Sequence, residues 1–194
     1  MWVRRVFPLQ MADSSLTRPH DYFLLTDRLG FGQWSEGDLP LALELWGDPG
    51  VSSLIGGPFT DREIGARLAR ERTMLIDHQV QYWPVFLLQS DDFAGCAGLR
   101  PYKNDGRIFE MGVHLKPSYQ GQGLAQEAAR AVIDFAFKTL QVRGLFVGHH
   151  PKNAASRRLI GRLGFSFTHE EFYAPTGANH LSYLLINPGC PETL

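Results

Sequence analysis

The chain has 194 residues, 44% of them hydrophobic and 20% charged, with a formal net charge of −1, and this length suits one domain with a good core rather than two. A near-neutral chain lacks the electrostatic signature of a nucleic-acid-binding protein, and no segment is long and apolar enough to cross a membrane. Two cysteines cannot form the disulfide framework of a small secreted domain, so we expect a cytoplasmic protein with neither nucleic acid nor membrane as a partner.

The N-terminal half of the chain alternates short strand and helix patterns. We expect residues 1–20 to be a flexible N-terminal arm, residues 21–187 one domain and residues 188–194 a C-terminal tail. A first strand with a kink is predicted over 24–34, a short helix over 36–46, and a longer helix that opens with the capping box Thr60-Asp61-Arg62-Glu63. Aromatic and β-branched runs predict strands over 81–89, 93–100 and 107–115, with turns at Asp91-Asp92 and Asn104-Asp105-Gly106.

The C-terminal half begins with a long amphipathic helix, predicted from about residue 123 to residue 140. A strand over 144–149 follows, and then a helix over 153–163 with Asn153 as its N-cap and Gly164 in the left-handed position that ends it. Strands over 165–173 and 181–186 close the domain. This order of elements predicts a mixed α/β (α+β) domain around a single central sheet.

The segment from Val113 to Ala125 is the most informative part of the sequence. A strand ends there, a glycine-rich turn follows, and an amphipathic helix begins. A helix N-terminus carries free N–H groups and a partial positive charge, and glycines let a ligand come close to that backbone, so the pattern favours a pyrophosphate site. A simple tight turn is the alternative interpretation. Walker and Rossmann loops are excluded, because Gly-Lys-Ser/Thr and the third glycine are both missing.

This segment resembles motif A of the GNAT acetyltransferase superfamily, Gln/Arg-x-x-Gly-x-Gly/Ala, which it matches fully. Downstream, Asn153-Ala154-Ala155-Ser156 and Leu163-Gly164-Phe165 resemble the signature of the RimJ/RimL-like branch, which acetylates the N-termini of ribosomal proteins. Thr26-Asp27-Arg28-Leu29 resembles that branch's opening motif. The resemblance implies a GNAT fold: one twisted, mostly antiparallel mixed sheet with helices on both faces and a V-shaped splay between the strands at 107–115 and 144–149.

The resemblance also implies the activity, which is transfer of an acetyl group from acetyl-CoA to a primary amine of a protein N-terminus or a small molecule, by direct attack on the thioester. Glu110 is then the candidate base and the N–H of Val113 the oxyanion donor; a solvated or salt-bridged glutamate is the alternative for Glu110. Ser156 is a candidate proton donor, because Ile160 occupies the place where many relatives carry a tyrosine. The residues expected to bind the cosubstrate are Met111, Val113, Leu115, Gln120, Gly121, Gln122, Gly123, Leu124, Ala125, Asn153, Ser156, Arg157 and Arg158.

Several assignments stay open at this point. Arg157 and Arg158 could contact the 3′-phosphate end of coenzyme A or could simply form a solvated helix face. Aromatic residues could line an acceptor groove, although core packing is their more frequent role: Trp34, Trp46, Phe59, Tyr82 and Trp83. We expect no metal site, and a homodimer is possible. A non-catalytic acyl-CoA-binding or regulatory module and a protein-interaction scaffold are the rival functions, and the acceptor cannot be identified from the sequence.

Overall fold

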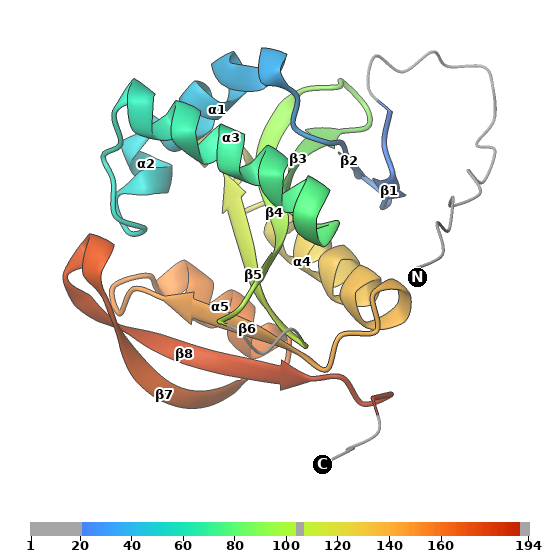
Figure 1. Cartoon of the computed structure of the whole chain (residues 1–194), viewed down its shortest axis with the longest axis vertical. Helices are drawn as coiled ribbons and strands as arrows, with labels where there is room; N and C mark the ends of the chain where they lie inside the picture. Colours follow the sequence, from blue (N-terminus) through green and yellow to red (C-terminus); the bar gives the residue numbers. More distant parts are fainter. Residues whose placement is uncertain (1–20, 104–106, 191–194) are drawn as a thin grey trace.

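A single eight-stranded sheet runs through the molecule (Figure 1). The computed structural model describes residues 21–103 and 107–190. The strand order is β1-β2-β3-β4-β5-β6-β8-β7, and every neighbouring pair is antiparallel except β5 and β6. The strands are β1 Leu24–Leu25, β2 Leu29–Phe31, β3 Tyr82–Leu87, β4 Phe93–Pro101, β5 Ile108–Leu115, β6 Gly144–His149, β7 Ser166–Tyr173 and β8 Ala178–Ile186.

Helices cover both faces of this sheet, as Figure 1 shows for α1 to α3 on one side and α4 on the other. The α-helices are α1 Leu39–Trp46, α2 Pro49–Ser52, α3 Asp61–His78, α4 Leu124–Asp134 and α5 Ala154–Arg162. The helix at α4 continues as one π-helical stretch over Phe135–Thr139. Short 3-10 turns cover Glu36–Asp38, Pro117–Tyr119 and Ala174–Thr176.

One hydrophobic cluster lies on each face of the sheet, between the sheet and the helices that cover it. One cluster joins the sheet to α4 and α5 through residues such as Ala128 and Ile160, and the other joins it to α1 and α3 through residues such as Leu45 and Ile64. Strand side chains alternate between the clusters: Trp83 belongs to the first and Tyr82 to the second. The central strands β3 and β4 are therefore buried on both faces, whereas β7 at the edge is mostly exposed.

The structure corrects one expected element and adds another. The kinked first strand is wrong, because β1 and β2 are separate strands of an antiparallel hairpin whose turn is closed by the N–H of Thr26 donating to the carbonyl of Leu29 at 2.9 Å. The predicted helix end at Trp46 is confirmed, but a second short helix, α2, which was not predicted, follows almost at once. Pro49 is its first residue, and the Asp48 side chain accepts from the N–H of Gly50 at 2.7 Å.

Most other elements agree with the sequence to within a few residues. The capping box of Thr60 and Glu63 opens α3, and Gly164 has a φ of +83° after α5. The mixed, mostly antiparallel sheet with helices on both faces is confirmed. The expected arm at 1–20 and the turn at Asn104-Asp105-Gly106 lie outside the described residues, as do residues 191–194 of the expected tail. No helix in the described part of the chain is long and apolar enough to span a membrane.

Candidate active site

The two parallel strands at the centre of the sheet separate soon after they begin. β5 and β6 pair only where residues 108–110 face residues 144–146, although both strands continue beyond that point. Figure 1 shows β5 running away from β6 past this short contact. Two strands that part leave backbone N–H and C=O groups without a partner strand. The expected V-shaped splay is present, and it opens a gap in the sheet next to Glu110.

The backbone groups of β5 that face this gap can be identified from the pairing on its other edge. The N–H of Lys116 donates to the carbonyl of Ala94 at 3.0 Å, so this part of β5 bonds β4 through its even-numbered residues. Backbone groups alternate in direction along a strand. Those of Met111, Val113 and Leu115 therefore point away from β4 and toward the gap. The pairing with β6 ends at Glu110, and the Leu115 carbonyl accepts from the Gln120 amide.

The glycine-rich turn lies directly beyond the end of β5. Gly121 and Gly123 have φ angles of +75° and +80°, a left-handed backbone that other residues adopt only with strain. A side chain at Gly121 would meet nothing within 4 Å. Within the described part of the chain, the backbone N–H groups from Gly121 to Ala125 have no hydrogen-bond partner. Five consecutive free donors at the start of α4 form a cradle for an anion.

Two glutamine side chains hold this turn in place rather than pointing into it. The Gln120 amide donates to the carbonyl of Leu115 at 2.9 Å, and the Gln122 amide donates to the carbonyl of Ser118 at 2.8 Å. Both side chains therefore bind the loop itself, and they leave its backbone N–H groups free. Leu124 then turns inward and is 2% exposed, which anchors the first turn of α4 in the core.

The motif Thr26-Asp27-Arg28-Leu29 ties the first hairpin to the same helix start. Glu127 accepts from the Thr26 hydroxyl at 2.6 Å and from the N–H of Arg28 at 2.9 Å, and the Arg28 Nε donates to its other oxygen at 2.6 Å. Arg28 also donates to the carbonyl of Gln122 at 3.0 Å. Partial burial opposes ionisation of Glu127, but the hydrogen bonds have the larger combined effect, so the pKa of Glu127 is lowered. The charged pair fixes the loop and the helix as one unit.

The N-terminus of α5 lies on the α4 side of the sheet. Asn153 caps it by accepting from the N–H of Ser156 at 3.0 Å, as expected. Ser156 is half-buried, and Arg157 and Arg158 are exposed. Ile160, where relatives carry a tyrosine, is 5% exposed and packs in the core.

Glu110 faces the opposite side of the sheet, toward α1 and α3. Its neighbour across β4 is Arg100, in direct register. Burial is the largest influence on Glu110 and raises its pKa, while Arg100, Tyr82 and Arg67 act in the other direction. A carboxylate with a raised pKa at the edge of a gap has the character of a general base.

Arg100 forms its ion pair with a second, fully buried carboxylate. Glu71 on α3 is 0% exposed and forms an ion pair with Arg100, and it also accepts from the backbone N–H of Tyr82 at 2.9 Å. This arrangement satisfies the buried carboxylate with two groups from two other elements, which is the condition for a stable buried ion pair. The role of Glu71 was not predicted from the sequence. Glu71 shares a helical spacing with Ile64 and Leu68, and this spacing could have indicated that it lies on the inner side of α3.

Two glycines in register let the Tyr82 ring lie across the sheet toward Glu110. Gly98 pairs with both Tyr82 and Gly112. A side chain at Gly112 would lie 2.5 Å from the Tyr82 ring and 2.7 Å from its hydroxyl. The guanidinium of Arg100 lies over the Tyr82 ring, 4.1 Å from the ring centroid. Among the aromatic residues considered for the acceptor groove, Tyr82 is thus beside Glu110, whereas Trp83 packs in the opposite cluster.

His114 and Cys96 supply neutral polar groups to the same face. The Trp46 Nε1 donates to the Nδ1 of His114 at 3.3 Å, and the Cys96 sulfur lies 3.8 Å from that nitrogen. Burial, with repulsion from Arg67 and Arg100, holds the pKa of His114 well below its usual range. Burial raises the pKa of the Cys96 thiol to about 12. Neither group is charged at neutral pH.

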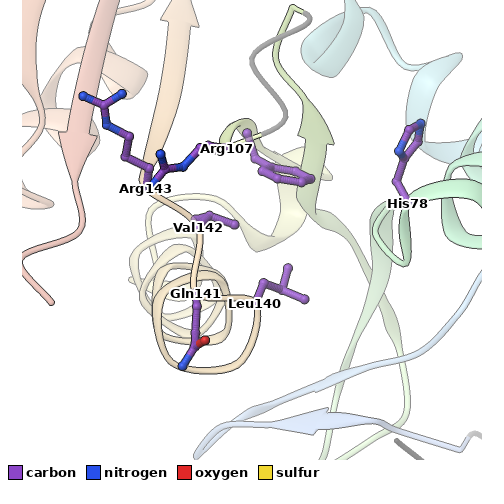
Figure 2. Close-up of a pocket in the computed structure, with 7 residues that line it drawn as sticks. His78, Arg107, Leu140, Gln141, Val142 and Arg143 are labelled. Atoms are coloured by element: carbon purple, nitrogen blue, oxygen red, sulfur yellow. The ribbon is translucent and has the colours of Figure 1, made fainter. Parts of the chain in front are cut away.

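A separate small pocket lies at the other end of the central strands. It has a volume of about 220 Å³ and is lined by residues at the start of β5 and just before β5 and β6, together with the C-terminal end of α3. Figure 2 shows His78 on the opposite side of this pocket from Arg107 and Arg143. The splay and the glycine-rich turn lie beyond the opposite ends of the same strands, so this pocket is not part of the candidate site.

Comparison with known proteins gives one family. A family model described as an acetyltransferase (GNAT) domain matches residues 28–166. An uncharacterized N-acetyltransferase, p20 of Bacillus licheniformis, is 26% identical over 148 residues, which cover 73% of this chain and 81% of that protein. A spermidine N(1)-acetyltransferase of Escherichia coli (strain K12) is 30% identical over 82 residues, covering 42% of this chain and 44% of that protein.

Solved structures agree with the fold. A putative ribosomal-protein-serine acetyltransferase from Vibrio cholerae superimposes with a TM-score of 0.70 at 20% identity, covering 84% of this chain and 96% of that one. At this identity the likeness concerns the arrangement of the chain and not its substrate.

Proposed function

The chain belongs to the GNAT acetyltransferase family, and from this premise we propose that it acetylates a primary amine, with Glu110 as the base and the turn from Gln120 to Ala125 as the phosphate site. The observation that supports the proposal is the continuity of two sets of backbone groups, one on β5 beyond its pairing with β6 and one at the start of α4. The free edge of β5 runs directly into the five free N–H groups at the start of α4.

These groups fit coenzyme A along its length. The N–H groups from Gly121 to Ala125 suit its pyrophosphate, because they form an anion cradle that no described side chain fills. The backbone of Met111, Val113 and Leu115 suits the pantetheine amides, which bind a free strand edge as another strand would. Asn153 and Ser156 at the start of α5 flank the gap from the α4 side, and exposed Arg157 and Arg158 are available for the phosphate at the far end. Acetyl-CoA supplies the acetyl thioester when it is bound.

The chain's own residues divide the proton transfers between the two faces of the sheet. Glu110 takes a proton from the amine, directly or through a water, on the α3 side, where Arg100 and Tyr82 hold its surroundings. The N–H of Val113, in the gap, donates to the oxygen on which negative charge develops. Ser156 lies on the α5 side and donates to the departing sulfur. Ile160 is in the core, so helix α5 offers no tyrosine for this step.

The acceptor is an amine that approaches from the Glu110 side. Similar proteins carry names that point to different amines: one is a spermidine N(1)-acetyltransferase, and another is a putative ribosomal-protein-serine acetyltransferase. Both a protein N-terminus and a small molecule remain candidates for this chain, and both present a primary amine whose proton must leave before or during attack.

The test is calorimetric titration with acetyl-CoA, followed by a turnover assay with a panel of amines. Saturable binding together with release of free thiol in the presence of an amine supports the proposal. Binding without turnover by any amine would favour a non-catalytic acyl-CoA-binding module. Absence of binding would mean that the turn is structural, and the chain would then be a scaffold.

A further inference from the structure

Arg67 on α3 carries a charge that forms no ion pair or hydrogen bond with any described residue. It lies on the inner side of the helix, between the buried residues Ile64 and Glu71, and faces the same side of the sheet as Glu110. Its guanidinium stacks on Trp46, 4.4 Å from the ring centroid, and lies 5.8 Å from that of Phe59. These stacking contacts fix the position of the guanidinium and leave its charge unpaired.

No carboxylate or carbonyl in the described part of the chain is bound to Arg67. Its Nε is buried without a hydrogen-bond partner, and the side chain forms no ion pair with any described residue. Glu71, one turn further along α3, is already bound to Arg100 and to the N–H of Tyr82. A guanidinium removed from water normally binds an anion, because the desolvation of the charge is otherwise uncompensated.

None of the other groups on this face of the sheet forms an ion pair with Arg67. From β4 come Arg100, which Glu71 neutralises, and the neutral thiol of Cys96. From β5 come Glu110 and neutral His114, and from β3 comes the un-ionised hydroxyl of Tyr82. Helix α1 contributes the Trp46 ring. Glu110 must accept a proton during the reaction, so at that stage it no longer offsets the charge of Arg67.

We propose that Arg67 binds an oxyanion, a carboxylate or a phosphate, carried by the acceptor itself, so that the substrate is an anionic amine and not a polyamine. This inference rests on the proposed function. The planar guanidinium, already oriented by Trp46, matches the two oxygens of such a group. An acceptor that carries further positive charges instead of an anion would meet the unpaired charge of Arg67 on this face and would be repelled.

A binding measurement tests the anion site without relying on turnover. The probes are acetate and, separately, inorganic phosphate, titrated into the protein saturated with coenzyme A. The side-chain Nε–H signal of Arg67 in nitrogen-15 NMR reports the contact, and its disappearance in Arg67→Gln assigns it. We expect a saturable shift, with affinity weakened about tenfold or more in Arg67→Gln. Arg70→Gln is the matched control, because Arg70 is exposed on the same helix.

The two probes also distinguish the two anions, since the tighter one identifies the group that the acceptor carries. A shift that does not saturate with either probe, or equal affinity in wild type and Arg67→Gln, overturns the inference. These outcomes are separate from failure of the proposed function, which would appear as absence of acetyl-CoA binding in calorimetry.

A second test of the anion site compares the kinetics of different acceptor amines. Each amino acid is compared with its own carboxamide, and spermidine is included. We expect kcat/KM to favour the acid over the amide by about tenfold, and this preference to disappear in Arg67→Gln while acetyl-CoA affinity is unchanged. Preference for the amide or for spermidine overturns the inference even if turnover is rapid. If no amine is acetylated, the transfer reaction fails, and the anion titration alone decides the role of Arg67.

Discussion

Glu110 and Arg100 lie directly opposite one another on β5 and β4, yet the guanidinium of Arg100 forms its ion pair with Glu71 on α3. A glutamate whose cross-strand partner is an arginine would ordinarily be ionised and held by that charge. Here Glu71 takes the arginine, and burial raises the pKa of Glu110. The buried pair thus keeps Glu110 available for proton transfer.

Glu110→Gln should reduce kcat by about a hundredfold or more, the usual effect of losing a general base, while acetyl-CoA affinity stays unchanged. In the wild type, kcat/KM should fall as the pH drops through the pKa of Glu110, because the protonated carboxyl cannot accept a proton. Burial places this acidic limb above the ordinary value of 4.5. Stopped assays over a pH series measure both effects. Glu170→Gln, at an exposed site on β7, is the control, and an unchanged kcat in Glu110→Gln would return that residue to a structural role.

Gly123→Glu should weaken coenzyme A binding by about a hundredfold or more, roughly 2.7 kcal/mol, because it adds bulk and negative charge at the anion cradle. The substitution also strains a residue with a φ of +80°. Gly164→Ala separates these effects, since Gly164 has a φ of +83° but lies at the end of α5. Calorimetry should show full affinity in Gly164→Ala, and retained affinity in Gly123→Glu would contradict the phosphate site.

Glu71→Gln should destabilise the protein by about 3–5 kcal/mol, because it leaves the Arg100 charge buried without a partner. The double substitution Glu71→Leu with Arg100→Met removes both charges and should cost less than the single one. Urea denaturation measures the free energies of unfolding. The exposed pair of Arg72 and Glu36, 3.5 Å apart, is the control, and Glu36→Gln should change stability by only a few tenths of a kcal/mol. A double variant as unstable as the sum of its single variants would argue against this account.

His114→Asn should flatten the dependence of stability on pH below 6.5. The folded-state pKa of His114 is depressed, so below 6.5 the unfolded chain binds a proton that the folded chain does not, and stability falls as the pH decreases. One such group contributes a slope of about 1.4 kcal/mol per pH unit. Asparagine retains an acceptor for the Trp46 N–H, so packing is disturbed little. Denaturation at a series of pH values measures the slope, and an equal slope in both proteins would exclude His114 as its source.

Local sequence patterns predicted the parts of the site that depend on adjacent residues. The turn from Gln120 to Ala125 and the Asn153 cap each need only a few consecutive positions, and the structure forms both. The network of Glu71, Arg100 and Tyr82 was not predicted, because its members come from three elements and meet only when α3 packs on the sheet.

The first hairpin shows the same limit on a smaller scale. Strand patterns at Leu24 and at Leu29 were both visible, but the reversal between them depends on Thr26 and Arg28 binding Glu127, about a hundred residues away. A single sequence contains no direct sign of such a distant partner. The motif Thr26-Asp27-Arg28-Leu29 indicated the family of the protein, but it did not indicate that the backbone reverses direction there.

The short contact between β5 and β6 divides the sheet into two halves that share only three residue pairs. Hydrogen-bonded pairing is what makes neighbouring strands unfold together, so the free protein has a weak mechanical and cooperative link at its centre. A ligand whose backbone-like amides bind both edges of the gap would join β1–β5 to β6–β8. Occupancy would then govern whether the two halves melt as one unit, and the shape of the unfolding transition would report on the cosubstrate level as directly as its midpoint does.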